Sequence, residues 1–354
     1  MENFNVLKFL FIIAIVFGHI GFSVSGNGET IHTFVYFYHI PLFFFLYGIM
    51  YKRESIVISI KKSLKELYFP FIITCVLFIL LRNVFINLGF YKVGSVDSLS
   101  QMISARTFID LFSFRYTEPL LGAIWIIPCL FFVNILYEFI NLVIKKIKFF
   151  TDSRDIILPI IIVSLFVIGF NNGMNGGFFR FKFDIVLVAL LFYYLGSEYA
   201  RVKDKVKINY AVALGLFILM IQNLNFGFID MNNRNYVNTA FFLFNSLVGI
   251  YINLAMVNFI LWIKNAKFKK MMYIIGESIF WILALHFVIF KIVTLIKINI
   301  GNMSPDILQY IFPGDVSSLS WVELMEYWIL GIFVPCALRM VYIKLKEYIL
   351  VRKD

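Results

Sequence analysis

Charged residues and cysteines are scarce in this chain. Only 15% of its 354 residues are charged, whereas 61% are hydrophobic. A soluble globular fold cannot hide so large an apolar fraction from water, so the composition excludes soluble enzymes and soluble binding modules. The three cysteines, Cys75, Cys129 and Cys336, lie inside apolar stretches, with no CxxC pair and no metal-ligand spacing. We expect buried free thiols that pack like small apolar residues, and no metal site.

Familiar catalytic motifs are also missing. The sequence has no GxSxG, no Walker loop, no HExxH and no glycine-rich dinucleotide fingerprint, which argues against classical serine hydrolases, nucleotidases and zinc proteases. The net charge of +11 could suit nucleic acid, but the basic residues form short clusters between apolar stretches. That pattern is typical of membrane orientation, so we predict membrane lipid and not nucleic acid as a partner.

Long apolar runs are abundant. They predict ten membrane-spanning helices, at about 6–24, 33–51, 67–88, 121–144, 156–171, 183–200, 208–224, 237–263, 272–296 and 321–345. The runs are too long, and alternate too little between apolar and polar residues, for a membrane β-barrel. We therefore predict an all-α, polytopic integral membrane protein, with residues 1–354 forming a single domain. The segment before Lys8 is not basic, so we interpret the first span as a retained helix and not a signal peptide.

Basic residues concentrate in alternate connecting segments. They cluster after the second, fourth, sixth and eighth spans and at the C-terminus: Lys52, Arg53, Lys61, Lys62 and Lys65; Lys145, Lys146, Lys148 and Arg154; Arg201, Lys203, Lys205 and Lys207; Lys264, Lys267, Lys269 and Lys270; Arg339, Lys344, Lys346, Arg352 and Lys353. The intervening loops hold few basic residues. By the positive-inside rule, this alternation predicts that both termini are cytoplasmic, in a multi-pass protein of the cell (inner) membrane.

The first span carries two ionisable residues, Lys8 and His19. Eleven helical steps place them about 20° apart around the axis and about 16 Å apart along it. An ionisable side chain at such depth is costly unless it faces protein or water, so this face predicts a polar cavity with Lys8 near one mouth and His19 deeper in. The alternative is that Lys8 reaches the interface and His19 packs as a structural histidine.

Three further histidines bear on this cavity. His39 lies in the outer half of the second span, at a depth it can share with His19, and His286 falls near the middle of the ninth span, whereas His32 is expected in the first outer loop, exposed to solvent. Two histidines at one depth beside a lysine suggest a proton-transfer site. Each alone is more often a hydrogen-bonded structural residue, and no carboxylate pattern supports a histidine metal site. Trp125 opens the fourth span, where a tryptophan is normally an interfacial anchor.

Two outer loops, 171–177 and 225–235, are rich in asparagine and glycine. Amides suit contacts with sugar hydroxyls, and both residue types equally suit ordinary turns.

Five stretches, in order, resemble the motifs of the membrane acyltransferase-3 family, closest to its fucose 4-O-acetylase-like branch. They are the basic-x10-His pair Lys8 and His19; Tyr38-His39-Ile40-Pro41-Leu42-Phe43-Phe44-Phe45-Leu46-Tyr47-Gly48; Lys61-Lys62-Ser63-Leu64-Lys65 running into Tyr68-Phe69-Pro70-Phe71; Ala123-Ile124-Trp125-Ile126-Ile127-Pro128-Cys129-Leu130-Phe131; and Gly276-Glu277-Ser278-Ile279 followed by Leu285-His286. The chain departs from the family pattern at Lys8, where arginine is commonest, and at Tyr47, where the family has serine.

The resemblance implies an O-acyltransferase of exopolysaccharide biosynthesis. The donor would be an acyl-CoA, usually acetyl-CoA, on the cytoplasmic side, and the acceptor a hydroxyl of a cell-surface polysaccharide or its lipid-linked precursor. His19, as general base or transient acyl carrier, and Lys8 would be catalytic. His39, Trp125, Glu118 and His286 would bind substrate, and Lys52, Arg53, Lys61, Lys62 and Lys65 would bind the donor. The competing hypotheses are a secondary transporter or flippase of a glycan-related substrate, although no internal repeat is evident, and a membrane sensor or scaffold without chemistry.

Overall fold

The structure is a computed structural model that describes residues 2–21, 28–91, 105–113, 118–176, 182–315 and 319–351. Throughout these ranges the regular elements are helices, and an isolated β-bridge joins Asp230 and Asn235. In the described part of the chain, eight helices are long and apolar enough to cross a membrane, and two shorter apolar helices span Asn3–Gly18 and Tyr210–Asn225. Each of the ten predicted spans overlaps one of these helices. The prediction of an all-α, polytopic membrane protein is confirmed.

The elements have the following bounds. In the first half of the chain they are α1 (Glu2–Gly18), α2 (Gly28–Tyr36), α3 (His39–Ile49), α4 (Ile56–Ser63), η1 (Leu64–Tyr68), α5 (Phe69–Leu80), α6 (Arg82–Asn87), α8 (Ala105–Phe112), η2 (Pro119–Trp125), α9 (Ile126–Lys146), α10 (Lys148–Asp152) and α11 (Arg154–Met174). In the second half they are α12 (Phe183–Val202), α13 (Tyr210–Gln222), η4 (Asn223–Asn225), α14 (Thr239–Leu261), α15 (Ala266–Glu277), α16 (Ile279–Asn299), η5 (Pro305–Gln309), η6 (Pro313–Asp315) and α17 (Trp321–Val351).

The first and third predicted spans have different boundaries in the structure. The first helix ends at Gly18 and not at 24, since the chain turns at His19 and Ile20 and Gly21 has a left-handed φ of 114°. The third begins at Ile56 and not at 67, because Ser55 caps α4 by accepting a hydrogen bond from the Ile58 amide at 3.3 Å. The chain then continues through the π-helical turn η1 into α5.

The basic segment after the second span is therefore partly helical, and not a loop throughout. Lys61 and Lys62 belong to α4, and Lys65 belongs to η1.

The ninth predicted span, 272–296, is divided in the structure. α15 ends at Glu277 and α16 begins at Ile279, with Ser278 between them. The Ser278 hydroxyl donates to the Ile274 carbonyl at 2.7 Å. This bond offers that carbonyl a partner outside the helical ladder and favours a break at this residue.

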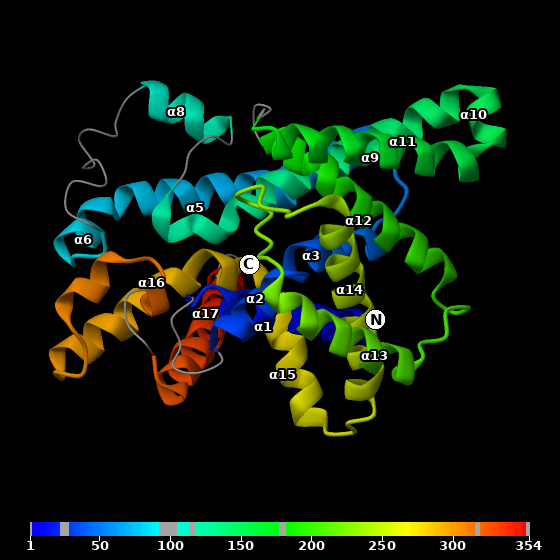
Figure 1. Cartoon of the computed structure of the whole chain (residues 1–354). Coiled ribbons are helices and arrows are strands. Elements are labelled where there is room, and N and C mark those ends of the chain that lie inside the picture. The colour runs from blue at the N-terminus through cyan, green and yellow to red at the C-terminus, as the bar shows by residue number, and fades with distance from the viewer. Residues whose placement is uncertain are drawn as a thin grey trace.

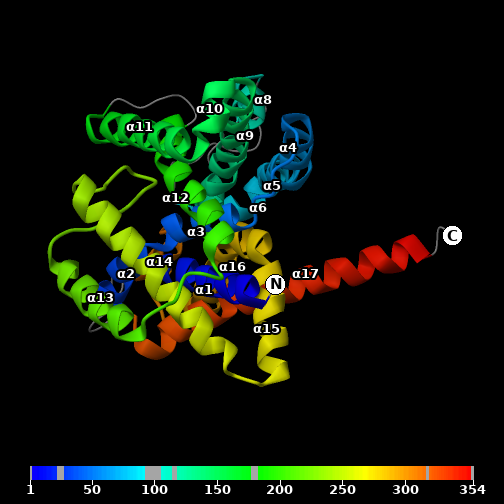
Figure 2. The same ribbon diagram turned by 90° about the vertical axis from the view of Figure 1, so that its right-hand side faces the viewer.

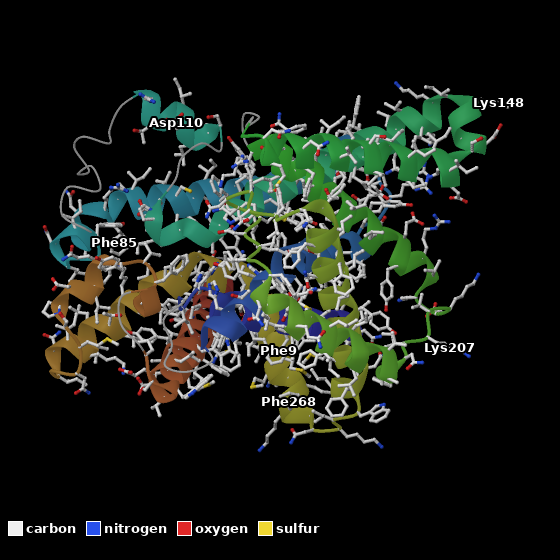
Figure 3. The ribbon with its side chains drawn as sticks, viewed as in Figure 1. Phe9, Phe85, Asp110, Lys148, Lys207 and Phe268 are labelled. Carbon is white, nitrogen blue, oxygen red and sulfur yellow. The ribbon has the colours of Figure 1, made fainter. Side chains whose placement is uncertain are left out.

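Helix α1 lies in the middle of the molecule in both views (Figures 1 and 2), where it contacts α2, α3, α14, α15, α16 and α17. Phe9 of α1 lies beside Phe268 of α15 (Figure 3), with ring centroids 6.3 Å apart. The last part of α17 projects away from the rest (Figure 2). Lys148 and Lys207, from two of the basic segments, lie on one side of the molecule, opposite Phe85 and Asp110 (Figure 3).

Helices α3 and α12 touch through their backbones. A Cβ on Gly48 would lie 2.0 Å from the Tyr193 carbonyl oxygen, and one on Gly196 would lie 2.0 Å from the Phe45 carbonyl oxygen. Only glycine permits this approach, which is typical of helix pairs in membranes. The contact fixes α3, and with it the position of His39 at the start of that helix.

Candidate active site

His19 lies in the turn that follows α1, with its backbone amide donating to the Ile15 carbonyl at 3.1 Å. Its side chain is 8% exposed and forms part of the wall of a cavity of about 470 Å³. We call this the outer cavity, because it lies at the end of α3 that the charge pattern predicts to be outside. Its wall comes from α1, α2, α3, η2, α16, the loop before α14 and the segment after α16, through residues Ile15, His19, Tyr36, His39, Ile40, Pro119, Gly122, Trp125, Phe228, Asp230, Met231, Asn232, Asn233, Phe287, Ile311 and Phe312.

His19 is paired with His286. The two rings lie nearly parallel, at an interplanar angle of 14° with centroids 5.1 Å apart, and meet edge to edge, with Nδ1 of His19 2.9 Å from Nε2 of His286. Nδ1 of His286 lies 2.7 Å from the Ile282 carbonyl oxygen, which can only accept, so that nitrogen carries the proton. In the neutral ring Nε2 of His286 is then an acceptor, and Nδ1 of His19 must donate to it. This chain of bonds leaves Nε2 of His19 as its basic nitrogen.

His39 shares the cavity with His19, as the sequence predicts. Their ring centroids are 6.4 Å apart at an interplanar angle of 89°. The Nδ1 proton of His39 is directed to the Val35 carbonyl, 2.9 Å away, which leaves Nε2 of this ring as an acceptor as well. The cavity wall thus carries two imidazoles, each with one nitrogen held by a defined partner.

The rest of the cavity wall is aromatic and amide-rich. Tyr36 and Phe228 lie with ring centroids 5.0 Å apart, and Trp125 joins them in the wall. Asn233 donates to the Asp230 carboxylate from its side chain at 2.8 Å and from its backbone at 3.1 Å. Flat apolar rings beside fixed hydrogen-bonding groups suit a ligand that presents both apolar faces and hydroxyls.

Lys182 and Arg234 fix the loop before α14 to the start of α12. Lys182 donates to the Asn232 side-chain oxygen and lies 5.2 Å from the centre of the Trp125 ring. Arg234 forms a bidentate ion pair with the fully buried Asp184, one bond of which is 3.0 Å long. Burial lowers the pKa of Lys182 from its ordinary value, and the Arg234 charge lowers it further.

Glu118, predicted to bind substrate, is next to the cavity wall and outside it. The carboxylate is buried, forms an ion pair with Arg82 and accepts a bond from the Tyr91 hydroxyl at 2.7 Å. It also accepts from the Leu120 amide at 3.4 Å. In this arrangement Glu118 holds the start of η2, the element that carries Trp125.

Lys8 is not brought to His19. Its Nζ forms an ion pair of 2.6 Å with Glu277, at the end of α15, and lies 4.7 Å from the centre of the Phe4 ring. Lys8 is therefore separated from the outer cavity by most of the length of α1. Glu277 belongs to the family-like stretch Gly276-Glu277-Ser278-Ile279. The sequence gives no sign that its partner is Lys8, because Lys8 and Glu277 are 269 positions apart.

A second cavity, of about 140 Å³, lies at the other end of α3. We call it the inner cavity. Of the five predicted donor-binding residues, Lys52 and Lys62 are in its wall, together with Glu54, Glu66 and Glu138. Arg53, Lys61 and Lys65 are exposed and lie outside that wall. Three carboxylates against two lysines make the interior a poor cradle for phosphates, so the basic residues can serve an anionic donor only from the rim.

His32 differs from its prediction. It belongs to α2, is 2% exposed and stacks on Tyr36 and Phe228 at centroid distances of 4.2 and 5.5 Å. The expectation of a solvated histidine was wrong because a polar loop sequence gives no sign that aromatic residues from a distant loop will cover it. The three cysteines are free and buried, as predicted.

Two wall residues from beyond α16, Ile311 and Phe312, are not anticipated by any sequence pattern. Phe312 stacks against His19 with ring centroids 6.0 Å apart. Tyr36 and Phe228 are likewise ordinary aromatic residues in an aromatic-rich chain. The amide-rich loop 225–235 is the one signal that could have led to this side of the cavity.

Comparison with known proteins bears on the chemistry. The family model described as an acyltransferase domain (Acyl_transf_3) matches residues 1–338. No curated protein and no solved structure matches the chain in the same kind of comparison. The family match covers nearly the whole chain, including both cavities and the paired histidines. The chain therefore belongs to the membrane acyltransferase-3 family.

Proposed function

We propose that this membrane acyltransferase moves an acetyl group from acetyl-CoA, on the cytoplasmic side, to a hydroxyl of a cell-surface polysaccharide or of its lipid-linked precursor. His19 acts as the general base. The acceptor occupies the outer cavity, and the donor enters from the inner cavity with its phosphates among the basic residues at the rim. The family match supports acyl transfer, and the composition of the outer wall supports a hydroxyl-bearing acceptor.

The reaction needs one proton transfer at the outer cavity. The acceptor oxygen attacks the thioester carbonyl carbon, the new C–O bond forms and the C–S bond breaks. The hydroxyl proton passes to Nε2 of His19, and the departing coenzyme A thiolate takes it up as a thiol. A positioned base of this kind typically contributes about 10²–10⁴-fold. His286 Nε2 accepts the hydrogen bond from the Nδ1–H group of His19 throughout and so keeps the basic nitrogen, Nε2 of His19, in place.

The hydrogen-bond chain through His19, His286 and the Ile282 carbonyl is the observation that carries this proposal. It determines which His19 nitrogen is basic, and it does so next to a cavity large enough for a sugar unit. The same logic orients the histidine of hydrolase triads, with a buried partner on one ring nitrogen and the substrate on the other. Here a neutral imidazole takes the place of the carboxylate.

The donor thioester must cross a short barrier between the two cavities. Ile40 and Tyr47 lie in the outer and inner walls, two turns apart on one face of α3, which is about 10 Å. Phe43 lies between them on the same face, fully buried, with its ring 4.7 Å from Tyr47 and 5.1 Å from Phe11. In our proposal these rings move aside when the acetyl-pantetheine arm enters.

The test measures acetyl transfer from acetyl-CoA to glycan, both with the purified protein and with isolated membranes. In membranes prepared from cells that carry the gene, radiolabelled acetyl-CoA should label the polysaccharide, and in membranes from cells that lack the gene it should not. His19→Ala and His19→Gln should each lose at least a hundredfold of the turnover while insertion and stability are kept, because a glutamine amide cannot accept the proton at neutral pH. Near-normal turnover of His19→Gln would refute the base assignment and move the search to His39. Glycan export without acetylation would favour a transporter.

A further inference from the structure

The segment between α16 and α17 covers one side of the outer cavity. It consists of η5 and η6 with the short stretch between them, residues 305–315, and we call it the covering segment. Its residues Ile311 and Phe312 lie in the cavity wall. Phe312 contacts both His19, at a centroid distance of 6.0 Å, and Phe287, at 5.6 Å. The covering segment therefore determines how much of His19 an incoming molecule can reach.

Lys291 of α16 holds this segment from one side. Its side chain is 2% exposed, and Nζ donates to the backbone carbonyls of Leu308 and Tyr310. No ion pair involves Lys291 among the residues that the structure describes. A buried lysine that donates to two backbone carbonyls is costly to bury. Its presence at this position therefore suggests a role beyond filling apolar space.

The other side of the segment is anchored to the histidine turn itself. The Gly314 amide donates to the Ile20 carbonyl at 2.8 Å. A Cβ on Gly314 would lie 2.9 Å from that same oxygen, so the contact depends on glycine. The two anchors flank Phe312, with Lys291 bonded to residues 308 and 310 before it and Ile20 bonded to residue 314 after it.

We propose that Lys291 is a positioning residue that clamps the covering segment over His19, so that the acceptor is admitted on one side of the imidazole and water is kept from the other. The role rests on the proposed function, since it concerns access to the same base. A lysine Nζ suits a clamp because one atom carries enough protons to donate to two carbonyls at once. The bonds also fix two carbonyls that a membrane protein cannot leave unpaired in its interior.

The experiment compares the full chain with three variants in lipid nanodiscs. Lys291→Met keeps the length and apolar stem and removes the donor. Gly314→Ala disturbs the second anchor independently. Lys297→Met is the matched control, because Lys297 lies on the same helix but pairs with Glu326 at 2.6 Å and Glu323 at 3.5 Å, away from the covering segment. Hydrogen exchange of the amides in 305–315 is followed by mass spectrometry, together with thermal stability.

We expect at least tenfold faster exchange of 305–315 in Lys291→Met and Gly314→Ala, and no such change in Lys297→Met. With acetyl-CoA as probe and no added glycan, the two clamp variants should release coenzyme A faster, since water reaches the acyl group. With glycan added, the ratio of acetyl transfer to coenzyme A release should fall at least tenfold in the same two variants. A merely structural lysine would lower both rates together and leave this ratio unchanged.

Three outcomes would overturn the clamp. These are unchanged exchange in Lys291→Met, equal acceleration in Lys297→Met, and faster exchange with an unchanged ratio of transfer to release. If the unaltered chain neither transfers nor hydrolyses acetyl-CoA, the proposed function fails by itself. The exchange of 305–315 still decides whether Lys291 holds the segment over the cavity.

Discussion

His286 determines, at the scale of single residues, which nitrogen of His19 can act. Its Nδ1 is committed to the Ile282 carbonyl at 2.7 Å, and its Nε2 faces Nδ1 of His19 at 2.9 Å. Since a ring nitrogen that donates cannot also accept, the orientation of His19 depends on an acceptor at position 286. The substitution at this position therefore tests orientation separately from base strength.

We expect His286→Phe to lower kcat about a hundredfold, within the range that a misplaced general base costs, and to leave the KM for acetyl-CoA unchanged. His286→Gln offers an amide oxygen as acceptor and should recover part of the loss. The measurement is steady-state transfer by variants of matched thermal stability. Equal kcat for His286→Phe and the unaltered chain would show that the contact only packs the core.

At the scale of elements, the α3–α12 contact holds the start of α3 at the outer cavity. Gly48→Ala would drive a methyl group into the Tyr193 carbonyl, and a clash with backbone cannot be relieved by a side-chain rotation. We expect a loss of about 2–4 kcal/mol of stability, seen as lower thermal stability and poorer recovery from the membrane.

Gly215→Ala is the matched control for this substitution. Gly215 also lies within a helix, α13, but nothing lies within 4 Å of a Cβ built there. Alanine should therefore be neutral or stabilise the protein by about 0.5–1 kcal/mol. Equal effects of the two substitutions would contradict the close-contact account of Gly48.

The basic segment 52–65, which includes α4, gives a second prediction at this scale. Lys52 and Lys62 lie in the inner cavity wall, whereas Lys61 and Lys65 are exposed and lie outside that wall. We expect the double variant Lys52→Gln, Lys62→Gln to raise the KM for acetyl-CoA several-fold, more at low than at high ionic strength, because exposed charge attraction is screened by salt.

The pair Lys61→Gln, Lys65→Gln changes the net charge equally and serves as the control. It should change the KM less, because its charges lie farther from the cavity. If both pairs act alike, the lysines contribute only a general field. If neither changes donor affinity in correctly inserted protein, their role is to orient the helices in the membrane.

At the scale of the whole molecule, the helices follow from the sequence more closely than the site does. Hydropathy is a local property, so the spans could be located, although Ser278 divides one of them and Ser55 starts another early. The contact of His19 with His286 joins residues 267 positions apart, and only a motif resemblance hinted at it. Phe312 and Lys291 have no local signal, because their importance comes from the fold that brings the covering segment over the cavity.

The arrangement of charge over the whole chain makes the last prediction, which is topological. Lys203 lines a cavity of about 370 Å³ with Asn3, next to the N-terminus, so both must lie on one side of the membrane. Ile49, the last residue of α3, lines that same cavity. Asn232 lies in the wall of the outer cavity, which is at the first residue of α3, His39. The positive-inside rule assigns the first side to the cytoplasm. Asn27, also predicted to be outside, falls beyond the described residues.

Single cysteines at positions 61, 203 and 232 should separate these sides. The three native thiols are buried, so an impermeant maleimide applied to intact cells should label Asn232→Cys and reach Lys61→Cys and Lys203→Cys only after permeabilisation. The opposite pattern would reverse the orientation and place the basic rim outside, where acetyl-CoA is absent. Because the donor is made in the cytoplasm, such a result would also remove the route from the inner cavity to His19 on which the transfer mechanism depends.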